Sequence, residues 1–171
     1  MEHIYQNIDG WTSFYDFYSD IVKKLPNGAR LVELGTYKGR SFSYLVVEAI
    51  NAGKVFDIVG VDAFPWEDVQ PAFIKNMEPL HGHFRYFKSL SWEAAKYFED
   101  ESIDFLFVDA DHVYEAVKKD IEAFLPKMKK GSIISGHDFN WQHPGVLQAV
   151  KEAFGDRIVY DERQDVWSVQ L

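Results

Sequence analysis

The sequence predicts an α/β fold, a doubly wound and mostly parallel sheet of seven strands with helices on both faces and an antiparallel C-terminal hairpin. Short apolar runs of strand length alternate five times with segments of helical periodicity, which is typical of a parallel sheet covered by helices. The run at residues 103–108 is apolar on both faces in its second half, as a central parallel strand requires. The last two runs lie so close together that they predict a hairpin.

Composition and charge limit the class of protein. A length of 171 residues fits one domain spanning residues 1–171, of which 1–28 form an N-terminal helical extension. The net charge of −9 disfavours a nucleic-acid partner, because neutralising phosphates requires a basic face. The absence of cysteine excludes disulfides, a thiolate zinc site and a thiol nucleophile.

Neither a targeting segment nor a membrane span is predicted. Residues 1–5 lack a basic region followed by an apolar run, and no stretch approaches the ~18 uninterrupted apolar residues of a membrane helix. We therefore expect a cytoplasmic protein without a membrane partner. The sequence leaves the oligomeric state open, with a homodimer as one alternative.

The first third of the chain predicts a helix, a strand and a second helix. The apolar residues of 11–25 fall on one helical stripe, which ends at the Pro-Asn-Gly turn 26–28. Residues 30–34 have the length and composition of a strand. The period is helical again over 41–50, and residues 51–53 close that helix because they tolerate the left-handed conformation.

The middle third predicts two strands with a long segment between them. The second strand covers 56–61, and the segment 63–82 holds one short helix at 72–77. A third strand follows at 84–88. Ser91 is expected to cap the short helix after it.

The last third repeats the alternation and ends in the hairpin. After a strand at 103–108, we expect Asp111 to cap a helix over 112–125. Pro144 begins the last helix, which Gly155 ends. The remaining strands are predicted at 131–135, 157–160 and 166–169.

The loop after the first strand is a candidate ligand site, since ligands of such sheets bind beyond the C-terminal strand ends. Gly35 and Gly39 allow a tight turn and a close backbone approach to a ligand. The next helix offers free N–H groups to a carboxylate or a phosphate. Tyr37 stands where a dinucleotide motif has its second glycine, which argues against a bound pyrophosphate. An ordinary strand–helix turn is the alternative.

Two further loops offer nucleotide contacts. Asp62, at the end of the second strand, can accept hydrogen bonds from both hydroxyls of a ribose, although a solvated loop acid or a helix cap is the alternative. The backbone of Ser89, Leu90 and Ser91 can pair with an adenine edge, but any helix cap has the same appearance.

Acidic and imidazole side chains follow the fourth and fifth strands, which are expected to be neighbours. Asp109, Asp111 and His112 follow the fourth strand, and His137 and Asp138 follow the fifth. Such a cluster of acids is costly without a cation. Oxygen ligands with an imidazole suit Mg²⁺, Mn²⁺ or a similar ion. The alternative is that Asp111 only caps a helix and that the histidines are surface or hydrogen-bonded groups. We favour this alternative for Asp111 and a functional role for Asp109 and Asp138.

The sequence from about Arg30 to Leu171 resembles the class I S-adenosylmethionine-dependent methyltransferases, whose fold is Rossmann-like. Residues 33–41 (Glu-Leu-Gly-Thr-Tyr-Lys-Gly-Arg-Ser) look like the first motif of this class, and Gly60-Val61-Asp62 looks like its ribose-binding acid. The closing hairpin resembles the reversed last strand of the fold. Residues 107–115, followed by Gly136-His137-Asp138, are similar to a bacterial branch that includes metal-dependent sugar and macrolide O-methyltransferases.

The resemblance implies methyl transfer from S-adenosylmethionine to a hydroxyl group of a small molecule, a sugar or another natural-product-like acceptor, assisted by a divalent metal ion such as Mg²⁺. Glu33 would fix the ammonium group of the cofactor, Asp62 its ribose, and Ala63, Ser89 and Leu90 would border its adenine. The full set of implied cofactor-binding residues is Glu33, Gly35, Thr36, Tyr37, Gly39, Ser41, Asp62, Ala63, Ser89, Leu90 and Asp109.

The same resemblance implies metal ligands and a base. The ligands are Asp109, His137 and Asp138, with His137 at a position where related enzymes often have a second acid. Catechol-type relatives have a lysine base where this chain has His112. The catalytic residues are therefore Asp109 and His112, and the base is either His112 or a carboxylate such as Asp109.

Other interpretations stay open. The domain could be a non-catalytic module that binds S-adenosylmethionine or a nucleotide, or a metal-dependent hydrolase or hydroxylase on the same scaffold. Tyr37 and the short chain disfavour a nicotinamide enzyme. Trp11, Phe14 and Tyr15 near the N-terminus could shape a substrate pocket or a dimer contact. Phe64, Trp66 and Phe73 in the segment 63–82 could cover the site, with packing at the edge of the core as the alternative.

Overall fold

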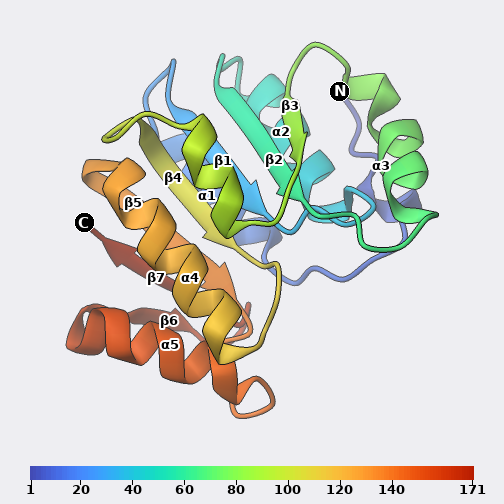
Figure 1. The fold of residues 1–171 in the computed structure, drawn as a ribbon. Coiled ribbons are helices and arrows are strands. Elements are labelled where there is room, and N and C mark those ends of the chain that lie inside the picture. Colours follow the sequence, from blue (N-terminus) through green and yellow to red (C-terminus); the bar gives the residue numbers. More distant parts are fainter.

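The computed structural model describes all residues from Met1 to Leu171. Its seven strands form one sheet in the order β3-β2-β1-β4-β5-β7-β6 (Figure 1). The pairs from β3 to β5 are parallel, and β7 runs antiparallel to both of its neighbours. The predicted sheet and its C-terminal hairpin are confirmed. The strands are β1 Arg30–Leu34, β2 Asp57–Asp62, β3 Arg85–Lys88, β4 Ile103–Val108, β5 Met128–His137, β6 Val159–Asp161 and β7 Val166–Gln170.

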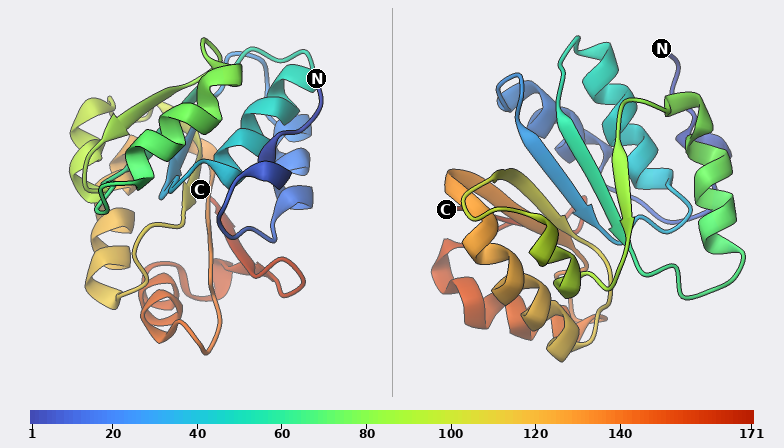
Figure 2. Two further views of the ribbon diagram at one scale, coloured as in Figure 1. Left: turned by 90° about the vertical axis from the view of Figure 1, so that its right-hand side faces the viewer. Right: turned by 45° about the horizontal axis from the view of Figure 1, so that its top comes forward.

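Helices cover both faces of the sheet (Figure 2). The α-helices are α1 Tyr15–Lys24, α2 Arg40–Asn51, α3 Val69–Met77, α4 Tyr114–Phe124 and α5 Pro144–Phe154. A 3₁₀ helix, η3, spans Trp92–Tyr97 between β3 and β4, and shorter 3₁₀ turns occur at Tyr5–Asn7, Glu78–Leu80, Leu125–Lys127 and Gly155–Arg157. None of the helices combines the length and the apolar character needed to cross a bilayer.

The core consists of two apolar layers separated by the sheet. Because successive side chains of a strand point to opposite faces, Leu31 of β1 packs with α1, α2 and α3, whereas Val32 packs with η3, α4 and α5. The same alternation places Phe105 and Leu106 of β4 in opposite layers. β4 is thus buried on both faces, as its sequence predicts.

The first helix begins at Tyr15 rather than at residue 11. The preceding segment, residues 8–13, is held in place by distant parts of the chain. Arg40 donates to the carbonyl of Ile8 over 2.8 Å, and the hydroxyl of Ser13 donates to the carbonyl of Gln164 over 2.8 Å. These long-range hydrogen bonds position the segment beside the carboxyl ends of the strands.

Two predicted helix caps are wrong. Ser91 occupies the N-cap position of η3, but its side chain makes no capping hydrogen bond. Helix α4 begins at Tyr114 and not at residue 112, because Asp111 accepts the N–H of Val113 over 2.9 Å in a turn before the helix. The chain from Asp109 to Val113 is therefore a loop.

The order in which strands are added to the sheet reverses between β1 and β4. The chain leaves β1 towards β2 and β3, and then returns to β4 on the other side of β1. The N–H of Asp109 donates to the carbonyl of Leu34 over 2.8 Å. The loop after β1 and the loop after β4 therefore separate just beyond this hydrogen bond. This is the place where doubly wound sheets bind their ligands.

Candidate functional site

A cavity of about 1160 Å³ opens at the carboxyl ends of β1, β2, β4 and β5. A smaller hollow of about 490 Å³ lies near the amino ends of β2 and β3, away from the predicted site. Most of the residues predicted for the site line the larger cavity: Gly35, Thr36, Tyr37, Ser41, Asp62, Ala63, Leu90, Asp109, His112, His137 and Asp138. Glu33, Gly39 and Ser89 are not among the lining residues.

Gly35 begins the loop after β1 and is required there by its neighbours. Its φ is +92°, and a Cβ at this position would lie 1.9 Å from the carbonyl oxygen of Asp109. Gly39 also has a left-handed φ, of +93°, and a Cβ there would lie 3.0 Å from Sδ of Met77 on α3. Packing against the end of β4 and against α3 thus requires both glycines, independently of any ligand that the loop binds.

Asp62 fixes the backbone of two loops. Its carboxylate accepts the N–H of Tyr37 over 2.7 Å and the N–H of Phe64 over 2.6 Å. Both residues have φ of +47°, a conformation that costs free energy in residues other than glycine. Asp62 therefore stabilises this backbone, and its carboxylate retains acceptor capacity on the cavity side for hydroxyl donors.

Glu33 lies in the core beside the cavity and not on its wall. Its side chain points to the α1 and α2 face of β1, where the carboxylate accepts hydrogen bonds from Tyr18 over 2.7 Å and from Ser41 over 2.5 Å. Burial raises the pKa of Glu33 to about 8, against the opposing effect of these two hydrogen bonds. Of these two hydrogen-bond partners, Ser41 lines the cavity and Tyr18 does not, and the predicted contact of Glu33 with a cofactor ammonium stays a prediction.

The loop after β3 contributes less than its sequence predicts. Ser89 donates its N–H to the carbonyl of Asp62 over 3.0 Å and its hydroxyl to the carbonyl of Leu90 over 3.0 Å. Leu90, together with Ser91 and Trp92, lines the cavity. The side chain of Ser89 thus supports the loop, while its neighbours form the wall.

Two carboxylates and two imidazoles predicted from the sequence meet at the ends of β4 and β5. Nε2 of His112 lies 2.6 Å from Asp138 Oδ2 and 3.7 Å from Asp109 Oδ1. Nδ1 of His137 lies 3.2 Å from Asp138 Oδ2 and 4.0 Å from Asp109 Oδ1. Asp138 has φ of +61°, so the fold holds this residue of the cluster in a costly conformation.

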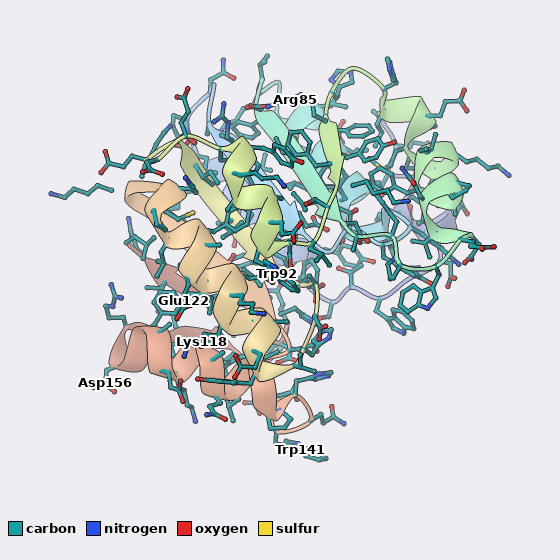
Figure 3. All side chains as sticks on the ribbon, in the orientation of Figure 1. Arg85, Trp92, Lys118, Glu122, Trp141 and Asp156 are labelled. Atoms are coloured by element: carbon teal, nitrogen blue, oxygen red, sulfur yellow. The ribbon has the colours of Figure 1, made fainter.

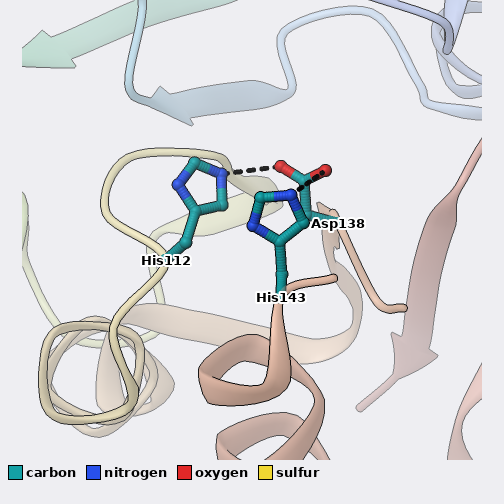
Figure 4. A group of neighbouring side chains, drawn as sticks. All are labelled: His112, Asp138 and His143. Atoms are coloured by element: carbon teal, nitrogen blue, oxygen red, sulfur yellow. Dashed lines mark ion pairs between the residues drawn. The ribbon is translucent and has the colours of Figure 1, made fainter. Parts of the chain in front are cut away.

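His143 is a member of this cluster that the sequence analysis missed. It precedes Pro144, the first residue of α5, and its Nε2 lies 3.4 Å from Asp138 Oδ1. His112 and His143 approach different oxygens of the Asp138 carboxylate, one from the loop after β4 and the other from the start of α5 (Figure 4). The helix-initiating Pro144 is the signal that could have placed His143 near the end of β5.

Comparison with known proteins identifies the family. The sequence model of a family described as "Methyltransferase domain" matches residues 32–139, from β1 to just beyond Asp138. The chain belongs to this methyltransferase family. The prediction that the chain is an enzyme, an S-adenosylmethionine-dependent methyltransferase, is thereby confirmed.

Two curated relatives of this methyltransferase domain have uninformative names. An uncharacterized protein of Sinorhizobium fredii is 29% identical over 139 residues, which are 71% of this chain but only 15% of that relative's length. An uncharacterized protein of Acanthamoeba polyphaga mimivirus is 26% identical over 170 residues, which are 91% of this chain and 74% of the relative. The chain thus spans a small part of the first relative and most of the second.

Solved structures of other methyltransferases share the fold. The O-methyltransferase NovP superimposes with a TM-score of 0.73 at 15% identity, over 92% of this chain and 79% of that one. CalS11, a TDP-rhamnose 3'-O-methyltransferase of calicheamicin biosynthesis, gives 0.68 at 20% identity, over 91% and 76%. An O-methyltransferase of Bacillus cereus in complex with SAH gives 0.67 at 18% identity, over 95% and 83%.

The pKa values of His112, Asp138 and Asp109 depart from their usual ranges because these side chains interact with one another and are partly or fully buried. The nearby carboxylates of Asp109 and Asp138 raise the pKa of His112 to about 10. Burial opposes ionisation of Asp138, but hydrogen bonds from His112 and His137 outweigh it and lower its pKa. Burial raises the pKa of Asp109, since its imidazole neighbours compensate only in part. Without another cation, the imidazoles supply the positive charge that the carboxylates require.

The cluster fits a divalent metal ion by its donor atoms. One ligand atom each from Asp109, His137 and Asp138 lie within 4.8 Å of one another, and the same holds for His112, Asp138 and His143. Two ligands at about 2.0–2.6 Å from one ion lie roughly 3–5 Å apart, which covers most of the distances in this cluster. Carboxylate oxygens and imidazole nitrogens are both ligands of divalent ions.

The aromatic side chains of the N-terminal segment and of the segment 63–82 lie either in the core or at the mouth of the cavity. Phe14, Phe64 and Phe73 are buried in the core. Trp11 and Trp66 line the cavity and are 84% and 62% exposed, respectively. Their rings lie 5.9 Å and 6.3 Å from the ring of Tyr37, measured between centroids. The same two segments therefore contribute both to the core and to the mouth.

Proposed function

We propose that this methyltransferase transfers the methyl group of S-adenosylmethionine to a hydroxyl group of a small molecule, with the help of a divalent metal ion. A single observation carries the proposal. The loop that Asp62 anchors and the cluster around Asp109 and Asp138 open onto the same cavity. One cavity can therefore align a cofactor with an acceptor, and such alignment removes much of the barrier of a displacement reaction.

The first part of the site would hold the cofactor. S-adenosylmethionine supplies a methyl group bonded to a positively charged sulfur atom. The backbone from Gly35 to Tyr37, held by Asp62, offers a rigid wall for it, and the remaining acceptor capacity of Asp62 suits the two ribose hydroxyls. Ala63 and Leu90 supply apolar surface for the adenine.

The second part would activate the acceptor. A hydroxyl group attacks weakly until its proton leaves, so the site needs a means of lowering its pKa and a group that accepts the proton. Asp109, His137 and Asp138 would hold the metal ion, which supplies charge that stabilises the deprotonated oxygen. His112, which touches both carboxylates, lies where it can accept the proton.

The protonation state of His112 depends on its neighbours. The negative charges of Asp109 and Asp138 raise its pKa to about 10, and an imidazolium cannot accept a proton. Neutralisation of these carboxylates by a cation reverses that effect and returns His112 towards the range of a base. We therefore assign the base to His112, with Asp109 as the alternative.

The acceptor would enter beside Trp11 and Trp66. Their exposed rings at the cavity mouth offer flat apolar surface to a ring-shaped acceptor. A sugar is a reasonable first choice, because CalS11, which shares the fold, is a TDP-rhamnose 3'-O-methyltransferase. Sugars and phenols with free hydroxyl groups are therefore the acceptors to test first.

A binding measurement combined with a transfer screen tests this proposal. The full chain is titrated with S-adenosylmethionine in a calorimeter, and transfer of its labelled methyl group is then assayed on a panel of sugars and phenols with Mg²⁺, Mn²⁺ or EDTA. We expect binding, transfer to at least one hydroxyl acceptor, and loss of transfer in EDTA. Binding without transfer to any acceptor would indicate a non-catalytic module, and no binding would contradict the proposal.

A further inference from the structure

When the imidazole of His137 is neutral, as a metal ligand must be, the hydroxyl of Ser13 determines which of its nitrogens carries the proton. Ser13 Oγ lies 2.8 Å from the carbonyl oxygen of Gln164 and 3.0 Å from Nε2 of His137. A carbonyl oxygen can only accept, so the single hydroxyl proton points to Gln164. The hydroxyl oxygen must then accept a hydrogen bond from His137, which requires a proton on Nε2.

The other nitrogen of His137 faces the carboxylates. With Nε2 protonated, a neutral imidazole has its lone pair on Nδ1, which lies 3.2 Å from Asp138 and 4.0 Å from Asp109. A lone pair directed at two carboxylates is unfavourable unless a proton or a metal ion lies between them. Phe14 packs against the imidazole, with ring centroids 5.0 Å apart, and helps to fix this orientation. Ser13 therefore presents Nδ1 as a ligand atom.

The proposed ligand set includes one imidazole nitrogen, that of His137, and two further imidazoles lie close to Asp138. His137 and His112 approach one oxygen of Asp138, and His143 approaches the other. Mg²⁺ prefers carboxylate oxygens and water and loses its water reluctantly. Imidazole suits the first-row transition metals, whose affinity for nitrogen ligands rises from Mn²⁺ through Co²⁺ to Ni²⁺.

We propose that Asp109, His137 and Asp138 bind a first-row transition-metal ion in preference to Mg²⁺, with Ser13 as the positioning residue that keeps Nδ1 of His137 available. This inference rests on the metal-assisted function proposed above and deepens it by naming the class of ion. It also gives the N-terminal segment 8–13 a role in the site, because Ser13 belongs to that segment.

Calorimetric titration of the full chain with CoCl₂ and with MgCl₂, in the absence of S-adenosylmethionine, tests the choice of ion. We expect Co²⁺ to bind at least about tenfold more tightly than Mg²⁺. His137→Asp replaces the nitrogen ligand by a carboxylate and is expected to abolish most of this preference. The visible absorption of bound Co²⁺ should change in the same variant, which provides a readout that does not depend on activity.

Two variants at position 13 test the positioning role. Ser13→Ala removes the hydroxyl and is expected to weaken Co²⁺ binding roughly tenfold, as loss of a group that orients a ligand does. Ser13→Thr retains the hydroxyl at an exposed position and should bind Co²⁺ like the wild type. Circular dichroism and thermal unfolding show whether each variant is folded.

The outcomes separate this inference from the proposed function. Binding of Mg²⁺ as tight as that of Co²⁺ would overturn the preference, while metal-assisted methyl transfer would stand. Binding of neither ion would contradict both the inference and the metal dependence. Unchanged Co²⁺ affinity in a folded Ser13→Ala variant would overturn the role of Ser13.

Discussion

The phenol of Tyr18 donates a hydrogen bond of 2.7 Å to the carboxylate of Glu33 in the core beside the cavity. Tyr18 lies on α1 and Glu33 on β1, and both side chains are almost fully buried. Glu33 thus links α1 with the strand whose end forms the cofactor loop. An acid in such a position makes stability depend on pH, because its charged form is desolvated.

Glu33→Gln is expected to change the pH profile of stability. Burial raises the pKa of Glu33 to about 8 from an unfolded value near 4.5, so the folded state retains a proton that the unfolded state has lost. Between pH ~5 and ~8, the wild type therefore loses unfolding free energy relative to the variant, by up to about 1.4 kcal/mol per pH unit. Urea denaturation at several pH values measures the difference. Parallel stability–pH profiles of the wild type and the variant would show that Glu33 ionises normally. Glu67→Gln, at an exposed position, is the control.

Asp62→Asn is expected to weaken binding of S-adenosylmethionine about tenfold or more. An amide has only one acceptor oxygen, so it cannot hold the N–H groups of both Tyr37 and Phe64 and also receive ribose hydroxyls. Calorimetry measures the affinity. Asp68→Asn provides the same chemical change at a cavity-lining side chain that is 74% exposed, and it should bind like the wild type. Equal losses in the two variants would argue against a specific role of Asp62.

Gly35→Ala is expected to destabilise the fold more than Gly28→Ala does, by about 2 kcal/mol or more. Both glycines have a left-handed φ, +92° and +83°, so both substitutions introduce backbone strain. Only at Gly35 would the new Cβ also collide with the Asp109 carbonyl, since nothing lies within 4 Å of a Cβ at Gly28. Thermal or urea unfolding compares the variants, and similar losses would show that the contact with Asp109 relaxes easily.

Trp11→Ala is expected to raise the KM for the acceptor while leaving stability and cofactor affinity close to those of the wild type. Trp11 lines the cavity mouth but is 84% exposed, so the fold gains little from its burial. Trp141 is 82% exposed as well, does not line the cavity and extends away from the body of the molecule (Figure 3). Steady-state kinetics with an acceptor from the transfer screen should therefore separate Trp11→Ala from Trp141→Ala. Identical kinetics in the two variants would remove Trp11 from acceptor binding.

The alternation of apolar runs predicts the sheet and its helices because burial on two faces leaves a regular trace in the sequence. Boundaries that depend on distant contacts leave no such trace. The first helix starts late because Ser13 bonds to Gln164, which is 151 positions away in the chain. The fifth strand extends back to Met128, past Gly131 with its φ of +81°, where its pairing with β4 shifts register.

The candidate site was predictable where it follows from topology, and less so where it depends on side-chain direction. Asp62, Asp109 and Asp138 lie at strand ends, and the parallel sheet brings them to one edge. Glu33 could have been placed correctly from the strand period, since it shares a face with Leu31 and not with Val32. His143 approaches Asp138 only because α5 begins where it does, which spacing alone does not reveal.

Methyl transfer by Asp109→Ala, measured alongside its binding of S-adenosylmethionine, tests the central claim most directly. Asp109 lies between the cofactor loop and the cluster, since its backbone carbonyl contacts Gly35 and its carboxylate faces His112. We predict that turnover falls about 10²-fold or more, while the affinity for S-adenosylmethionine changes by less than about tenfold. Turnover close to that of the wild type would contradict the convergence of cofactor and acceptor chemistry on this one cavity.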